Sequence, residues 1–148
     1  MIRRKNLAVV LFILTVCVSV LLYQCGSDNP STPSPPDDET IISDPSFSQH
    51  IQPIFNNNCA LALCHVSGTI TELDLSQGAA YTNIVNVDSG QDPSFKIILP
   101  GNSTDSWLVM KIEGRQTAGL RMPPSADPLS NVRIQNIKNW VDRGAKDN

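Results

Sequence analysis

The chain has 148 residues and a net charge of −3 at pH 7, which leaves room for only one modest domain. Without the basic cluster at residues 3–5, 8 basic residues face 14 acidic ones, so the chain lacks the basic surface that nucleic-acid binding needs. Aromatic residues make up 5% of the chain, which is few for a domain that must build its own core. A bulky apolar cofactor would complete such a core.

Residues 1–25 have the pattern of an export signal, because the basic cluster precedes an apolar run from Leu7 to Tyr23. The end of this run, at Cys25, resembles a bacterial lipoprotein signal, in which Cys25 is lipidated and becomes the new N-terminus. Gln24 stands where such signals carry a small residue, so an uncleaved anchor helix is the alternative. Both interpretations predict an exported protein held at a membrane, in the periplasm or on the outer cell surface.

Residues 26–45 read as a tether, because they are rich in proline and acidic residues and have no aromatic residue. Proline-rich segments are extended and semi-rigid. We therefore expect one folded domain over residues 46–148. That domain carries 8 basic and 9 acidic residues and is close to neutral.

The predicted domain begins with an amphipathic helix. Its apolar residues Phe47, Ile51, Ile54 and Phe55 recur at helical spacing. Pro53 has no amide hydrogen and should kink the helix or restart it.

Two further helices are predicted. One covers residues 106–112, and the other runs from about Asn131 to Arg143, with Ser130 as its N-terminal cap and Gly144 closing it. The two tryptophans of the chain lie on the apolar faces of these helices and are expected in the core. The predicted fold class is mostly α.

Residues 59–65 place two thiols and one imidazole close together, as Cys59, Cys64 and His65. In c-type haem attachment, two cysteines bind the haem vinyl groups and the histidine directly after the second cysteine binds the iron. The usual spacing has two residues between the cysteines, whereas four lie here, so the loop must bulge. The alternatives are a disulfide between Cys59 and Cys64, or a zinc site that also uses His65, with or without His50.

The chain resembles the planctomycete-type cytochrome c domains over residues 46–146. The matching segments are residues 51–55, 59–65, 100–103, 122–124 and 129–145. The resemblance implies a small cytochrome c-like helical fold wrapped around one covalently attached haem c, and expanded spacings between the two cysteines occur in that family. It also implies that Cys59 and Cys64 form the thioether bonds, with His65 and Met122 as the axial ligands of the iron.

Met122 has two rivals as the distal ligand, Met110 on a predicted helix and His50 on the first helix. A methionine followed by prolines 123 and 124 lies on a stiff segment with little conformational entropy to lose, which favours Met122. The neighbouring Arg121 is expected either to pair with a haem propionate or to be exposed.

Iron with thioether, histidine and methionine ligation has no open coordination site, so the expected function is outer-sphere electron transfer rather than enzyme catalysis. The expected partners are redox proteins that dock weakly, and the membrane through the N-terminus. The rivals are a haem peroxidase, a module attached to a dehydrogenase, and a structural or zinc-binding lipoprotein.

Overall fold

The structure is a computed structural model that describes residues 40–69, 71–124 and 127–148. The chain divides into two compact units, Met1–Thr32 and Pro33–Asn148. The first unit lies outside the described residues, as do the predicted export signal and Cys25. No helix in the described part of the chain has the length and apolar character needed to cross a bilayer.

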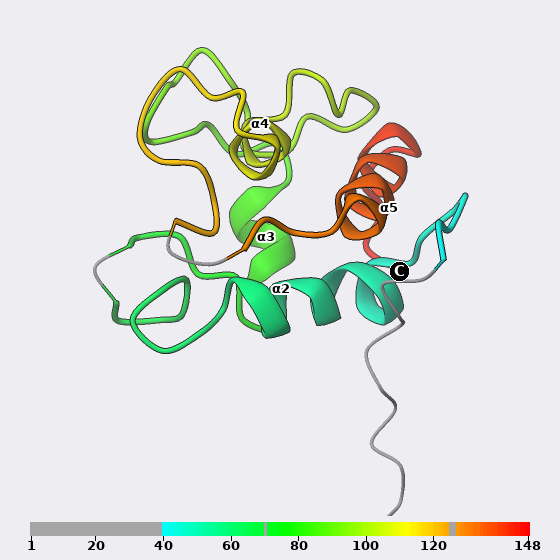
Figure 1. Cartoon of the computed structure of the whole chain (residues 1–148), viewed down its shortest axis with the longest axis horizontal. Coiled ribbons are helices and arrows are strands. Elements are labelled where there is room, and N and C mark those ends of the chain that lie inside the picture. The colour runs from blue at the N-terminus through cyan, green and yellow to red at the C-terminus, as the bar shows by residue number, and fades with distance from the viewer. Residues whose placement is uncertain (1–39, 70, 125–126) are drawn as a thin grey trace, which may run out of the picture. The chain divides into compact units, whose positions relative to one another are not determined.

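Helices are the only regular secondary structure of the described residues, joined by long loops that carry a few isolated β-bridges (Figure 1). The elements in chain order are the π-helix η1 (Phe47–Ile51) and the α-helices α2 (Gln52–Asn58), α3 (Ala80–Ile84), α4 (Trp107–Glu113) and α5 (Asn131–Asp142). The predicted mostly α class is therefore confirmed at this level.

The first predicted helix consists of η1 and α2, which follow each other directly. Its apolar stripe is buried, with Phe47 and Ile51 on η1 and Ile54 and Phe55 on α2. Pro53 lies in the first turn of α2, where its missing amide hydrogen leaves no helical bond unmade. The expected interruption at this proline is confirmed, and its form is a wider helical turn just before it.

The later two predicted helices are confirmed with their caps. Gly114 has a φ of 77° and ends α4 in the left-handed conformation that glycine adopts easily. The Ser130 hydroxyl accepts a hydrogen bond of 3.3 Å from the backbone amide of Arg133 and starts α5. Gly144 follows the end of α5 with a φ of 97°.

Helix α3 has no counterpart among the predicted elements. It is only 5 residues long, and no side chain caps its N-terminus. Ala80 and Ile84 are completely buried, and the Tyr81 hydroxyl donates to the carbonyl of Ala145 at 3.0 Å. Tertiary packing therefore stabilises this helix more than its local sequence does.

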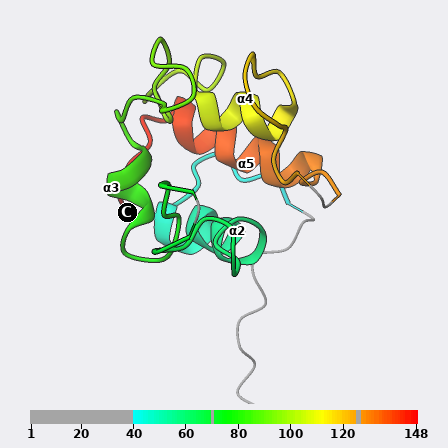
Figure 2. The same ribbon diagram turned by 90° about the vertical axis from the view of Figure 1, so that its left-hand side faces the viewer.

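Aromatic rings join the first and last helices in the core. The Phe47 ring lies 5.2 Å from the Trp140 ring and 5.3 Å from the Tyr81 ring, measured between centroids. Trp107 is also buried and stacks on Phe95 at 5.7 Å. The core positions expected for both tryptophans are confirmed. Figure 2 shows α4 and α5 packed side by side.

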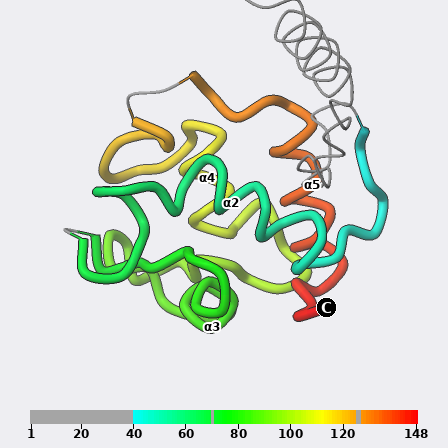
Figure 3. Tube along the Cα trace, turned by 90° about the horizontal axis from the view of Figure 1, so that it is seen from below, coloured from blue at the N-terminus to red at the C-terminus, as the bar shows by residue number. Residues whose placement is uncertain are grey.

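The described chain begins with a segment that is bonded to α5. Asn136 accepts from the Ile42 amide at 2.8 Å and donates to the Thr40 carbonyl at 3.2 Å, and Asn139 donates to the Ile42 carbonyl at 2.7 Å. Figure 3 shows this segment running beside α5. The packed domain therefore includes residues 40–42, which the sequence pattern assigns to the tether at residues 26–45.

Candidate functional site

The loop that carries the two cysteines is closed by backbone hydrogen bonds at the end of α2. The Cys59 amide bonds to the Phe55 carbonyl at 2.8 Å, and the His65 amide bonds to the Cys59 carbonyl at 3.1 Å. Leu63 takes a left-handed conformation with a φ of 67°, which is uncommon for a branched side chain. The extra residues of the motif thus form a compact turn that brings its two ends together.

Both thiols of this loop are free, and their surroundings differ. Cys59 is partly buried and packs against the core, whereas Cys64 is exposed. Burial, with a smaller contribution from the nearby Cys64, raises the pKa of the Cys59 thiol to about 12. The Cys59 thiol is therefore protonated at neutral pH, and Cys64 is the more accessible of the two.

The His65 ring is oriented by a backbone acceptor. Its Nδ1 lies 3.1 Å from the carbonyl oxygen of Leu73, and the Leu75 amide bonds to the His65 carbonyl at 2.9 Å. Because a carbonyl oxygen only accepts, Nδ1 carries the hydrogen and Nε2 of the neutral ring keeps its lone pair. This is how histidines that bind a metal through Nε2 are usually held.

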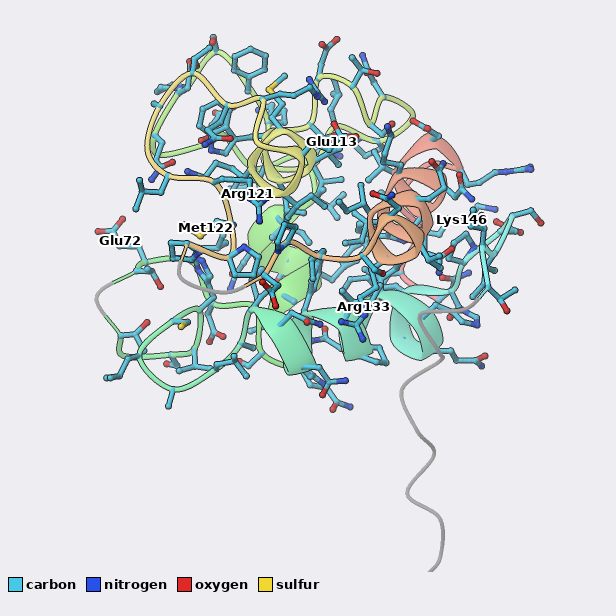
Figure 4. All side chains as sticks on the ribbon, viewed as in Figure 1. Glu72, Glu113, Arg121, Met122, Arg133 and Lys146 are labelled. Atoms are coloured by element: carbon cyan, nitrogen blue, oxygen red, sulfur yellow. The ribbon has the colours of Figure 1, made fainter. Side chains whose placement is uncertain are left out.

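Met122 lies on the segment that returns from α4 toward α5 (Figure 4). Its amide donates to the Lys111 carbonyl on α4 at 2.9 Å. Its side chain is partly buried and packs against the core cluster that Cys59, Ala60 and Leu73 also contact. The structure thus brings the predicted distal methionine and the cysteine loop to one common core.

The rival distal ligands are placed differently. Met110 is buried on α4, but it is not a member of the core cluster that the described residues form. His50 lies on η1, and its Nδ1 accepts a hydrogen bond of 2.9 Å from the Ser46 amide. Met110 therefore lies outside the core cluster against which Met122 and Cys59 pack.

A zinc site is not assembled in the described part of the chain, where no three His, Cys, Asp or Glu side chains come together to hold a metal ion. The ring of His50 is engaged at the start of the domain, and Cys64 is exposed.

Apolar side chains are exposed on the two segments that carry the motif and Met122. Leu61 is 45% exposed, Leu63 84% and Leu120 68%. Large apolar side chains at such exposure are a feature to be explained when they gather on functional segments. Three exposed leucines therefore lie on these two segments.

Arg121 is neither fully exposed nor ion-paired in the described residues. It lines a cavity of about 350 Å³ between the end of α4 and the start of α5, together with Leu129 and Ile134. Figure 4 shows Arg121 and Met122 on the same segment. The position is compatible with an anionic group near Met122.

Two contributors to the site have no signal in the motif itself. The Leu73 carbonyl is a backbone group, so the side-chain sequence does not reveal its role. Lys111 was detectable in principle, because it is a charged residue within the otherwise mostly apolar segment 107–113.

A comparison with known protein families, curated proteins and solved structures finds no match.

Proposed function

We propose that this protein is an exported c-type cytochrome with one haem, held at a membrane, that carries electrons by outer-sphere transfer. The observation that carries the proposal is the His65 ring, whose Nδ1 is bonded to the Leu73 carbonyl, in the loop after α2 that also carries two free thiols. This combination supplies both covalent attachment points and one axial ligand from a single closed loop.

Four side chains would hold the haem. Cys59 and Cys64 would form the thioether bonds, and His65 Nε2 and the Met122 sulfur would bind the iron. When bound, haem supplies a one-electron iron couple. The chain contributes a neutral thioether at Met122, which disfavours the higher charge of the oxidised state and raises the reduction potential relative to a second histidine.

The proposal extends to the fold, which we assign to the cytochrome c-like class. The cysteine motif follows the first helical segment, and Met122 precedes the last helix, α5. The first and last helices meet through Phe47 and Trp140. A mostly helical unit with the cysteine motif ahead of the methionine is what the resemblance to cytochrome c domains implies.

The proposed partners are redox proteins that dock weakly and transiently. The exposed Leu61, Leu63 and Leu120 give the segments around the motif an apolar character, and the domain is close to neutral. A small apolar contact area suits short-lived electron-transfer encounters.

Expression in a host that has haem-ligation machinery tests the proposal. The exported protein should be red, should retain its colour after denaturation and acid-acetone extraction, and should gain the mass of one haem. Cys59→Ala and Cys64→Ala should each leave at most one thioether bond and lower the yield of coloured protein.

A colourless product with two free thiols would refute the proposal. Stoichiometric zinc in that product would support the zinc-binding lipoprotein instead. A disulfide between Cys59 and Cys64 would support a structural role.

A further inference from the structure

The side chain of a buried lysine on α4 has no role in the site as described so far. Lys111 is 6% exposed, and a charged side chain at such depth needs partners. Its ammonium group donates to Gln91 Oε1 at 2.9 Å and to the Ala118 carbonyl at 3.3 Å. It also lies 5.9 Å from the centroid of the Trp107 ring, at a distance typical of cation–π contacts.

These contacts join two loops that are far apart in sequence. Gln91 belongs to the loop before α4, and Ala118 belongs to the segment of residues 115–121 that leads to Met122. A second bond between the same loops runs from the Thr117 hydroxyl to Asp92 at 3.1 Å. Lys111 is therefore the buried junction of α4 with both loops.

The segment closes tightly over the ammonium group at Gly119. This glycine has a φ of 67°, and a Cβ atom there would lie 2.9 Å from Lys111 Nζ and 3.0 Å from Gln91 Oε1. The backbone conformation favours glycine at this position, and a larger residue would push the ends of the Lys111 and Gln91 side chains aside. The segment is thus shaped to fit the lysine and its partner.

The same lysine also holds Met122 through its backbone. The Met122 amide donates to the Lys111 carbonyl at 2.9 Å. Lys111 therefore fixes the segment at two points, at Ala118 through its side chain and at Met122 through its carbonyl. Hydrogen bonds from a buried charged group contribute more than neutral ones.

We propose that Lys111 is a positioning residue, whose ammonium group latches residues 115–121 against α4 so that Met122 is held in place as the distal ligand. The inference rests on the proposed function for the identity of Met122 as an iron ligand. The latch itself rests only on the contacts of Lys111.

Hydrogen exchange on the exported protein tests the latch. Lys111→Met keeps the apolar stem and removes the donor, and Gln91→Ala removes the main acceptor at an exposed position. Both variants should speed exchange of the amides of residues 115–122 by about tenfold or more, as expected for losing a bond to a charged group. Lys96→Met, which removes a lysine paired with Asp88, is the matched control and should leave these amides unchanged. Unchanged exchange in Lys111→Met and Gln91→Ala would overturn the latch, whether or not haem is bound.

Capture of imidazole by the oxidised, haem-loaded protein tests the positioning of Met122. If the latch holds Met122 against iron, capture should be about tenfold faster in Lys111→Met and Gln91→Ala. Val109→Ala makes a cavity at a completely buried core position on α4, so it should lower the unfolding temperature without this acceleration.

The outcomes separate the two proposals. Faster exchange with unchanged imidazole capture would overturn the positioning role and leave a purely structural lysine. A parent protein without haem would refute the proposed function and with it the iron-ligand part of this inference, and the exchange rates would still decide the latch.

Discussion

At the scale of single residues, the candidate site depends on backbone carbonyls as much as on its reactive side chains. The Leu73 carbonyl selects the tautomer of His65, and the Lys111 carbonyl fixes the amide of Met122. A residue held in this way has few conformations to lose when its side chain binds a ligand. Mutagenesis replaces side chains but not backbone carbonyls, so substitutions can test the role of each reactive side chain separately.

Replacing Met122 by alanine tests the distal ligand. Oxidised parent protein should show the weak far-red charge-transfer band of an iron–methionine bond, and Met122→Ala should lack it. The variant should also have a lower reduction potential and should bind carbon monoxide quickly when reduced, which the parent should resist. Absorption spectroscopy, a redox titration and gas mixing measure these changes.

Met110→Ala is the matched control for this substitution. Met110 is 7% exposed, so its loss should destabilise the fold by roughly 2–5 kcal/mol through the cavity it leaves and should leave the band intact. A Met122→Ala protein that keeps both the band and its resistance to carbon monoxide would make Met110 the first candidate. A parent that lacks the band would point to His50.

The two thiols should differ in reactivity in protein produced without haem. At pH 8, iodoacetamide should alkylate the exposed Cys64 at least about tenfold faster than Cys59, because the raised pKa keeps Cys59 protonated. Peptide mass mapping over time measures both rates. In urea the two alkylation rates should become equal, because Cys59 is no longer buried in the unfolded protein. Equal rates in the native protein would contradict the buried placement of Cys59.

At the scale of elements, the sequence predicts the helices whose apolar residues repeat over two or more turns. The stripe from Phe47 to Phe55, the segment that became α4 and the capped α5 all fall into this class. The sequence does not predict helix α3, because its 5 residues are too few for a periodic signal. Its helical conformation depends on tertiary burial. Pro53 predicts an interruption of the first helix, but the sequence does not predict the wide π-helical turn before it.

The same distinction holds for the site. Cys59, Cys64 and His65 are neighbours in sequence, so their spacing alone predicts a shared role. The core contact common to Met122 and Cys59 arises from long loops whose paths have no periodic pattern. The bond from Lys111 to Gln91 spans 20 positions and depends on the same loop paths. The sequence alone therefore does not predict these contacts.

An ion pair links α4 to α5 and should make stability depend on pH. Glu113 accepts from Lys138 at 2.8 Å and from Arg115 at 2.6 Å. Burial opposes the ionisation of Glu113, but these hydrogen bonds and positive charges outweigh it and lower its pKa below 4.5. The stabilisation is therefore present above about pH 4.5 and is lost as the pH falls through the lower pKa of the folded state.

Glu113→Gln should cost no more than about 1 kcal/mol near neutral pH, because the pair is partly exposed. The difference in unfolding free energy between parent and variant should shrink as the pH falls below about 4.5. Urea unfolding at a series of pH values measures it. In a double-mutant cycle, Lys138→Met should have a smaller effect in the Glu113→Gln background. A difference that stays constant down to pH 3 would contradict the pairing.

At the scale of the whole molecule, the segment of residues 40–42 fixes where the tether leaves the folded unit. Asn136 and Asn139 hold this segment on α5, and Figure 1 places it on the opposite side of the unit from the loop of residues 60–69 that carries the cysteine motif. The described unit therefore begins away from the loop that carries the cysteine motif.

The last prediction concerns the N-terminal anchor. If Cys25 is lipidated, the mature protein should begin at Cys25, carry the mass of its lipid chains and partition into detergent. Each buried methylene group of a lipid chain contributes about 0.8 kcal/mol to membrane binding, so two or more chains give stable anchoring. The proline-rich tether, at about 3 Å per residue, would then hold the domain a few tens of ångströms from the bilayer surface. Cys25→Ala should abolish lipid attachment and leave the precursor unprocessed, whereas Cys17→Ala, the matched control in the apolar run, should behave as the parent. Mass spectrometry of the membrane fraction measures each case: an intact leader in the parent would support the uncleaved anchor helix, and a soluble product cut elsewhere would refute both forms of tether.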